Sequence, residues 1–246
     1  MSSRFLVVAS VSSCLALGAE PGPWMALFDG QSTAGWRTPG GRAFPAECWR
    51  VEDGALKPEM TPGGKSDIWT TETFRNFELE FEFKTATGAN GGLKYLIQRG
   101  GVSRSRNGKY VGPAAETPAE PGDFINESSL GFEYQILDDT ANPEGSKPKT
   151  KTAALYQLLP SSGNPPATPG VFHRGRIVVD GDRIEHHLDG QLVMQTRLGS
   201  PELEAAFDER KGSATWRALA KRESPIVLTH HRTAVWYRNV RVRRLP

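Results

Sequence analysis

The stretch FELEFEFKT, residues 77–85, constrains the fold more than any other part of this chain. Apolar side chains stand at positions 77, 79, 81 and 83, and charged side chains at 78, 80, 82 and 84. Successive side chains of a β-strand point to opposite faces of its sheet. The pattern therefore predicts an antiparallel strand with one buried face and one face in water.

Other short segments carry strand and turn signals of the same kind. Residues 48–58 predict a hairpin around Asp53-Gly54, because Asp-Gly favours a tight two-residue turn. Residues 175–198 predict three strands joined by tight turns at 180–182 and 189–190. Further strands are expected in 91–98, 131–137 and 234–245.

Two segments depart from this rhythm. Residues 99–126 are rich in Gly, Ser, Pro and Arg, which predicts a long loop. Residues 200–222 predict a helical region, with Ser200 as N-cap and Pro201 at the first helical position. No repeat and no alternation of strands with helices is visible in the 246 residues, so we expect a single all-β sandwich.

The N-terminus has the composition of an export signal. Arg4 precedes an apolar run from Phe5 to Leu17 and a small-residue end, which predicts a signal peptide over residues 1–19 and a mature domain over 24–246. The run is too short to predict a membrane span. We expect a periplasmic or extracellular protein, and lipidation at Cys14 is the less favoured alternative. Cys48 would then be the one thiol of the mature chain.

Charge and motifs narrow the chemistry. A formal net charge of +2 without a long basic run argues against nucleic acid as a partner. Phosphate-binding loops, dinucleotide-binding glycines, G-x-S-x-G and H-E-x-x-H are absent from the sequence. The pairs His186-His187 and His230-His231 would point to opposite faces of a strand, so neither pair can chelate one ion. No metal site is readable, and the cofactor stays unknown.

The stretch LGFEYQILDD, residues 130–139, carries the most interesting carboxylates. Glu133 and Gln135 share one face of the expected strand, and Asp138-Asp139 begin a turn. These side chains could be ordinary surface residues or part of a sugar site. A two-carboxylate glycosidase needs a second acid at a defined separation. Because Gln135 and Leu137 follow Glu133 at alternate positions, the arrangement found in laminarinase-type enzymes is absent.

Eight stretches together resemble one family. They are ALFDGQSTAGWR (26–37), WRVEDGAL (49–56), FRNFELEFEFK (74–84), GANGGLKYLIQ (88–98), LGFEYQILDD (130–139), AALYQLLP (153–160), RIVVDGDRIEHHLDGQLV (176–193) and RNVRVRRL (238–245). In this order they are similar to the 3-keto-disaccharide hydrolase domain family, over about residues 25–246. The resemblance implies a concanavalin-like jelly-roll β-sandwich of two antiparallel sheets with one short helical excursion.

The resemblance also implies a reaction. Family members act on glycosides or disaccharides whose sugar a separate sugar 3-dehydrogenase has oxidised to a ketone at C3. The ketone acidifies the proton on C2, so a base can remove it, the C1 substituent leaves, and water adds. Such a site needs a general base, a proton donor for the leaving oxygen and a group that stabilises the enolate.

The family motifs place candidate residues in this sequence. The resemblance implies catalytic roles for Glu133, Asp138, His231 and Lys94, and substrate-binding roles for Gln135, Tyr156, His186, Arg238 and Asn90. Glu133 or a histidine could serve as the base, and Lys94 or Arg238 could stabilise the enolate. Each residue also has a structural alternative, such as a strand surface, a core position or a turn.

The sequence departs from the family pattern at three points. Asn90-Gly91-Gly92 stands where many members have N-S-G, residues 228–231 read LTHH in place of L-Q-D-H, and residues 185–190 read EHHLDG in place of E-H-W-L-N-G. An aspartate and a tryptophan that could stack on sugar are thereby replaced by His230 and His187. The alternative function is a non-catalytic, lectin-like carbohydrate-binding domain, in which exposed tryptophans would bind the sugar.

Overall fold

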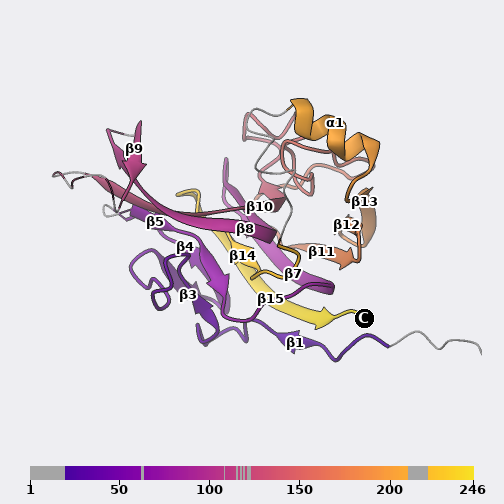
Figure 1. Ribbon diagram of the computed structural model, residues 1–246, viewed down its shortest axis with the longest axis horizontal. Coiled ribbons are helices and arrows are strands. Elements are labelled where there is room, and N and C mark those ends of the chain that lie inside the picture. Colours follow the sequence, from indigo (N-terminus) through magenta and orange to yellow (C-terminus); the bar gives the residue numbers. More distant parts are fainter. Residues whose placement is uncertain are drawn as a thin grey trace, which may run out of the picture.

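The computed structural model describes residues 20–61, 64–107, 109–114, 116, 118, 120, 123–209 and 221–246. The expected signal peptide, residues 1–19 with Cys14, lies outside the described residues. The described chain forms two β-sheets that pack face to face, with one helix at the edge (Figure 1). The prediction of an all-β, jelly-roll sandwich with one helical excursion is confirmed.

The first sheet, called sheet A here, is built around the alternating segment 77–85. Its strand order is β13-β12-β11-β7-β15-β4-β3, and β1 pairs with β15. Its strands are β1 (Met25–Ala26), β3 (Trp49–Glu52), β4 (Ala55–Pro58), β7 (Phe77–Thr85), β11 (His173–Asp180), β12 (Arg183–Leu188), β13 (Gln191–Arg197) and β15 (Val235–Arg244). All pairings in this sheet are antiparallel.

The second sheet, sheet B, has the strand order β2-β6-β14-β8-β10-β5, with β9 paired to β8. Its strands are β2 (Trp36–Arg37), β5 (Gly64–Ser66), β6 (Ile68–Thr70), β8 (Asn90–Arg106), β9 (Lys109–Pro113), β10 (Phe124–Leu137) and β14 (Val227–Leu228). Its pairings are antiparallel except for β5, which runs parallel to β10.

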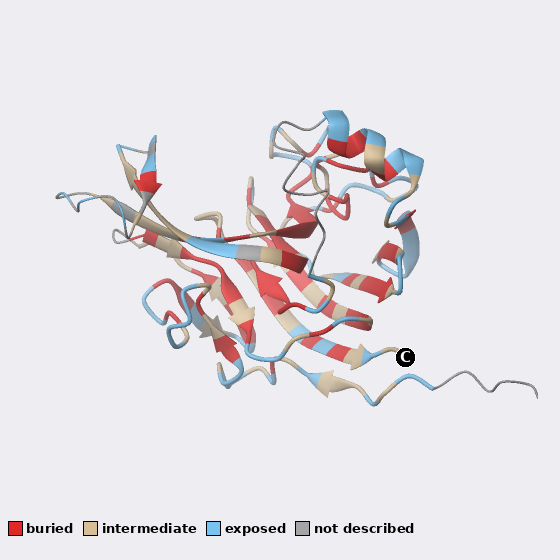
Figure 2. Ribbon diagram, in the orientation of Figure 1, coloured by how far each residue is buried: buried red, intermediate tan, exposed pale blue. Residues whose placement is uncertain are grey.

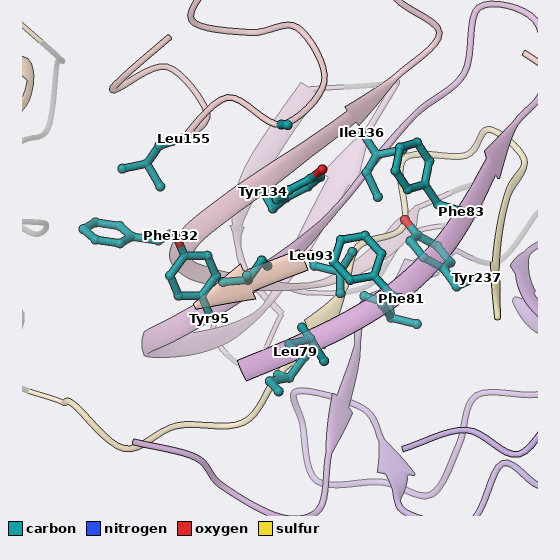
Figure 3. Packing of buried hydrophobic residues seen from close by; sticks show 14 of the residues in the cluster. Leu79, Phe81, Phe83, Leu93, Tyr95, Phe132, Tyr134, Ile136, Leu155 and Tyr237 are labelled. Carbon is teal, nitrogen blue, oxygen red and sulfur yellow. The ribbon is translucent and has the colours of Figure 1, made fainter. Parts of the chain in front are cut away.

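The core lies between the two sheets. The apolar positions of β7, Leu79, Phe81 and Phe83, face Tyr95 of β8 and Tyr134 of β10 (Figure 3). The rings of Phe81 and Tyr134 pack edge to face with their centroids 5.2 Å apart, an arrangement that aromatic pairs prefer. Buried residues are concentrated where the strands of the two sheets face each other (Figure 2). The alternating patterns of both sheets thus fix which side chains remain on the outer faces.

Turn chemistry behaves as the sequence predicts. Asp53-Gly54 joins β3 to β4 and Asp189-Gly190 joins β12 to β13, and all four residues have positive φ. A two-residue turn of this kind matches the twist of the strands that it connects. The predicted hairpins at these two positions are confirmed.

The predicted long loop over 99–126 is wrong. β8 continues to Arg106, β9 follows, and β10 begins at Phe124, so the long strands β8 and β10 stay paired beyond the sandwich (Figure 1). Arg106 donates to Asp123, the residue before β10, at 2.9 Å. Gly and Ser weaken the strand signal of a sequence, yet the backbone pairing of two long partners does not require apolar side chains.

Helix α1 spans Pro201–Glu209, at the start of the predicted helical region, and residues 210–220 lie outside the described residues. The hydroxyl of Ser200 accepts from the N–H of Leu203 at 3.3 Å, as an N-cap does. Phe207 points toward the core and packs on Phe132 of β10, with 6.2 Å between the ring centroids. No helix of the described residues is long and apolar enough to cross a membrane.

Candidate active site

Glu133 lies on the outer face of sheet B, near the middle of β10. Its neighbours in the strand, Phe132 and Tyr134, point into the core, as the alternation predicts. Glu133 is opposite Lys94 of β8 in the register, and its carboxylate leans over Gly92, where a Cβ would lie 2.5 Å from Oε1. A glycine at 92 is therefore needed to seat this carboxylate, which is only 8% exposed.

Two basic side chains lie on either side of Glu133. Lys94 Nζ is 3.9 Å from Oε2, and His231 Nε2 is 3.8 Å from Oε1. Both separations exceed ordinary hydrogen-bond length. Lys94 also donates to the carbonyl of Ser129 at 3.1 Å, and the His231 side chain keeps 33% of its surface exposed. The structure thus brings three of the four predicted catalytic residues together.

The predicted polar neighbours Gln135 and Asn90 lie beside this cluster. Gln135 is the next outer residue of β10, and its amide donates to Asn90 Oδ1 at 3.2 Å. Tyr156 lies on a loop that runs along the edge of β10, where its N–H donates to the Glu133 carbonyl at 3.0 Å. Burial, and then the charges of Glu144 and Glu133, raise the pKa of Tyr156 to about 12. Its hydroxyl therefore stays protonated at neutral pH.

Asp138 does not join the cluster, and its predicted catalytic role is corrected. It is fully buried, and its carboxylate accepts from the N–H groups of Gly88, Thr140 and Ala141 and from the Thr140 hydroxyl. Burial raises its pKa, but the hydrogen bonds from Thr140 and its neighbours outweigh burial and hold the pKa below its usual value. Asp138 fastens the turn that follows β10.

His186 is also placed away from the outer face, and its predicted role in substrate binding is corrected. It is fully buried between the sheets, where Nε2 bonds the Tyr95 hydroxyl at 2.7 Å and Nδ1 bonds the Ala153 carbonyl at 2.9 Å. Burial lowers its pKa to about 3. The sequence shows that His186 and His187 face opposite sides, but not which of them faces the core.

Arg238, predicted to bind substrate, lies on the outer face of sheet A, so the structure does not bring it to the Glu133 cluster. It donates to Glu82 at 2.7 Å and stacks on Phe172 at 3.6 Å from the ring centroid. His187, which replaces the family's tryptophan, lies on this same face and bonds Glu185 and Arg176. That departure from the family pattern is therefore remote from the Glu133 cluster.

The other two departures lie at the cluster. A Cβ at Gly91 would lie 2.7 Å from the Tyr237 hydroxyl, which accepts from the N–H of Gly92 at 3.2 Å. His230 is buried, its Nδ1 accepts from the N–H of Arg232 at 3.1 Å, and its Nε2 bonds the Glu59 carbonyl at 2.9 Å. Glycine at 91 thus leaves room for the Tyr237 hydroxyl, and histidine at 230 ties the segment that carries His231 to Glu59.

The segment 64–70 supplies residues that the sequence analysis did not single out. Lys65, Asp67 and Trp69 alternate with the buried Ser66, Ile68 and Thr70. Trp69 Nε1 donates to the Ser129 hydroxyl at 2.5 Å, and burial lowers the pKa of Lys65 although the charge of Asp67 opposes that shift. The alternation in GKSDIWT was a usable signal, but each strand is only three residues long.

A cavity lies on the outer face of sheet A. It measures about 1120 Å³ and is bordered by Glu78, Glu80, Glu82, Arg174, Arg176 and Arg241, among other residues. Its three glutamates are each held by arginine: Glu78 by Arg176 and Arg243, Glu80 by Arg241, and Glu82 by Arg238. A carboxylate bonded directly to an arginine fork has its oxygens occupied and is poorly placed to take a proton from a substrate. Size therefore favours sheet A, but acid–base chemistry favours sheet B.

The described residues contain no group of three or more His, Cys, Asp or Glu side chains that could hold a metal ion. The chemistry available at sheet B is thus that of a carboxylate, an amine, an imidazole, two amides and a phenol. A carboxylate between two basic groups can accept a proton from a substrate carbon while a cation stabilises the charge that develops on oxygen.

Comparisons with known proteins identify the family. Residues 23–243 match the family described as the 3-keto-alpha-glucoside-1,2-lyase-like domain. The chain belongs to this family. A curated relative, the 3-keto-disaccharide hydrolase of Bacteroides thetaiotaomicron, is 28% identical over 260 residues, which cover 98% of this chain and 84% of the relative.

Solved structures support the fold of this family member. One from Parabacteroides distasonis ATCC 8503, described as a "putative glycosyl hydrolase", has a TM-score of 0.71 at 23% identity and covers 91% of this chain and 94% of its own. A second from the same organism, described in the same words, has a TM-score of 0.57 at 23% identity. The match covers 85% of this chain and 99% of that structure's chain. These likenesses support the β-sandwich fold.

Proposed function

We propose that this protein cleaves 3-keto-glycosides, with Glu133 as the general base. The observation that carries the proposal is the position of the Glu133 carboxylate, with Lys94 Nζ 3.9 Å from one oxygen and His231 Nε2 3.8 Å from the other. Family membership and the name of the curated relative support the choice of substrate. The general activity is that of a glycoside hydrolase.

The reaction follows from the acidity that a C3 ketone gives to the proton on C2. Glu133 takes this proton, and the electron pair of the C2–H bond forms an enolate with the C3 oxygen. The enolate then collapses, the C1–O bond breaks, and the departing oxygen takes a proton. Water adds its hydroxyl to C1 and a proton to C2 across the resulting double bond, which completes a net hydrolysis.

Lys94 and His231 have distinct roles in this scheme. The Lys94 ammonium stabilises the enolate oxygen, because a fixed cation interacts most strongly with charge that develops in the transition state. His231 protonates the departing oxygen, and its partial exposure gives it access to solvent protons. The buried Gln135 amide donates to Asn90 and orients it, Asn90 presents its own amide to the sugar hydroxyls, and Tyr156 borders the same face.

The cluster fits this chemistry better than direct glycoside hydrolysis. Direct hydrolysis uses two carboxylates placed across the scissile bond. On β10 the outer position after Glu133 holds an amide, Gln135, and Asp138 is committed to its turn. One base beside one cation is what an elimination at an activated carbon requires.

The substrate must come from a separate dehydrogenase that oxidises the sugar at C3, because the proposed step begins from the ketone. We also infer that the protein works in the periplasm or outside the cell. This inference rests on the apolar N-terminal run of Phe5–Leu17 and the small residues that follow it.

The test compares two chromogenic substrates that differ only at C3. Purified protein is incubated with a 3-keto-glucoside and with the unoxidised glucoside of the same aglycone, and release is followed by absorbance. We expect release from the keto compound alone. Release from the unoxidised glucoside at an equal rate would contradict the proposed mechanism. Binding of both compounds without release of either would identify the carbohydrate-binding alternative.

A further inference from the structure

We propose that Asp67 is a positioning residue that holds Lys94 and His231, the two basic groups beside Glu133, in place. Asp67 lies between β5 and β6, is 3% exposed, and does not itself border Glu133 in the sheet register. The inference rests on the proposed function, because it assigns a role within the same site. Its test separates the two.

Asp67 ties two distant segments together. Oδ2 accepts from the N–H of Ser129 at 3.1 Å, and Oδ1 accepts from the N–H of His230 at 3.0 Å. Its own N–H donates to the carbonyl of Glu127 at 2.9 Å. One buried carboxylate therefore joins β10 to the loop after β14. Bonds from N–H groups to a carboxylate are stronger than those between neutral groups.

Each of these two segments carries one basic group of the site. The carbonyl of Ser129, next to the amide that Asp67 holds, accepts from Lys94 Nζ at 3.1 Å. His231 follows His230 directly, and its Nε2 is 3.8 Å from Glu133. Asp67 therefore acts on Lys94 through Ser129 and on His231 through the backbone of His230. A shift of about 1 Å in such groups can lower a rate about 100-fold.

Asp139 provides a matched control. It is also buried, and its carboxylate also accepts two backbone N–H groups from separate segments, Thr152 at 2.8 Å and Ala167 at 2.9 Å. Neither segment carries Lys94 or His231. Replacement of either aspartate by asparagine puts an NH₂ group in place of one acceptor oxygen, so the local structural cost is similar.

The kinetic test compares Asp67→Asn with Asp139→Asn on the 3-keto-glucoside. We expect Asp67→Asn to lower kcat about 10- to 100-fold with KM changed less than about 3-fold, because the affected groups act in the transition state. Asp139→Asn should keep kcat within about 3-fold. When Lys94 is already replaced by methionine, Asp67→Asn should lower kcat by a smaller factor than it does in wild type, since contributions that act through one group are not additive. The same fold-decrease in wild type and in Lys94→Met would overturn the proposal.

Hydrogen exchange decides the inference independently of turnover. Peptides that contain Ser129 and residues 229–232 should exchange faster in Asp67→Asn than in wild type, and should be unchanged in Asp139→Asn. If both stay as protected as in wild type, Asp67 does not position them, whatever the enzyme's rate. An inactive wild type with the expected exchange pattern would instead overturn the proposed function alone.

Discussion

The outer faces of the two sheets both place carboxylates beside basic side chains, but the contacts differ. On sheet A, Arg238 donates to Glu82 at 2.7 Å and Arg241 donates to Glu80 at 2.9 Å, while Glu78 is held by both Arg176 and Arg243. On sheet B, Glu133 has its basic neighbours at 3.8 and 3.9 Å. The difference lies in contact geometry and in the choice of arginine against lysine and histidine.

This difference suits the pairs on sheet A to a structural role and the cluster on sheet B to a catalytic one. An arginine fork fixes a carboxylate and never gives up its proton, so a pair of this kind is a structural element. Lysine and histidine can exchange protons, and a gap of almost 4 Å lets a substrate group rearrange between the partners. A buried carboxylate that is kept for chemistry costs stability, which is the usual compromise at a functional site.

The largest expected difference between the two faces is catalytic. Glu133→Gln keeps the shape of the side chain but removes the base, so kcat on the 3-keto-glucoside should fall about 10³-fold. Glu80→Gln, the matched change on sheet A, should leave kcat within about 2-fold, because it is remote from the site. Initial rates and circular dichroism on both variants check this. Unchanged turnover in Glu133→Gln would show that another residue is the base.

Lysine replacements give the next largest contrast. Lys94→Met retains the alkyl chain and removes the cation that stabilises the enolate, which should lower kcat about 10²-fold. Lys84 lies on the outer face of sheet A, over the rings of Phe172 and Trp236 at 5.0 and 4.5 Å. Lys84→Met should have no kinetic effect. Equal rates for Lys94→Met and wild type would remove Lys94 from the mechanism.

The fold could be predicted from the sequence further than the site could. The alternation in residues 77–85 and 131–137 identified buried and outer faces correctly, and Asp-Gly pairs located two hairpin turns. Alternation is a local signal, because the two-residue period of a strand is set by its own backbone. It placed Glu133 and Gln135 on one outer face without any tertiary information.

The site itself depends on which strands become neighbours. His186 and Arg238 were grouped with Glu133 by motif, yet one lies in the core and the other on sheet A. Asp67 was not recognised because its role depends on contacts with Ser129 and His230, which are 62 and 163 positions away. A period-two pattern states that neighbouring residues face opposite ways, but not which face meets the other sheet.

For folding stability we expect the opposite order: replacement of a sheet A glutamate should cost more than replacement of Glu133. Glu78 has a side chain that is 6% exposed, and it neutralises both Arg176 and Arg243. Burial raises its pKa, but the bonds from Arg176 and Arg243 prevail and hold it below its usual value. Glu78→Gln leaves two arginines without their charged partner and should lower the free energy of unfolding by about 2 kcal/mol.

Urea unfolding at neutral pH measures this effect. Glu80→Gln, whose glutamate is 33% exposed and whose partner Arg241 is 51% exposed, should cost less than about 1 kcal/mol. Glu133→Gln should cost nothing or stabilise the protein. A larger loss in Glu133→Gln than in Glu78→Gln would contradict the assignment of the two faces.

A pH-dependent contrast comes from the interior that the two faces share. The pKa of His186 is lowered to about 3 by burial, so the folded protein keeps this imidazole neutral while the unfolded chain binds a proton near pH 6.5. The unfolded state thus holds more protons between these two values. The free energy of unfolding should fall as the pH drops from about 6.5 towards 3, by about 1.4 kcal/mol per pH unit for this one group.

Urea unfolding of wild type and His186→Gln between pH 7 and 5 tests this slope. Glutamine cannot titrate, so the variant should be less stable at pH 7, because it disturbs the bonds to Tyr95 and Ala153, but its stability should depend less steeply on pH. Glu78 gains its stabilisation above its unfolded pKa, near 4.5, and loses it only below that value, so it contributes little in this window. An identical slope in the variant would place the acid sensitivity on another group, with the buried His230, whose pKa burial also lowers, as the next to replace.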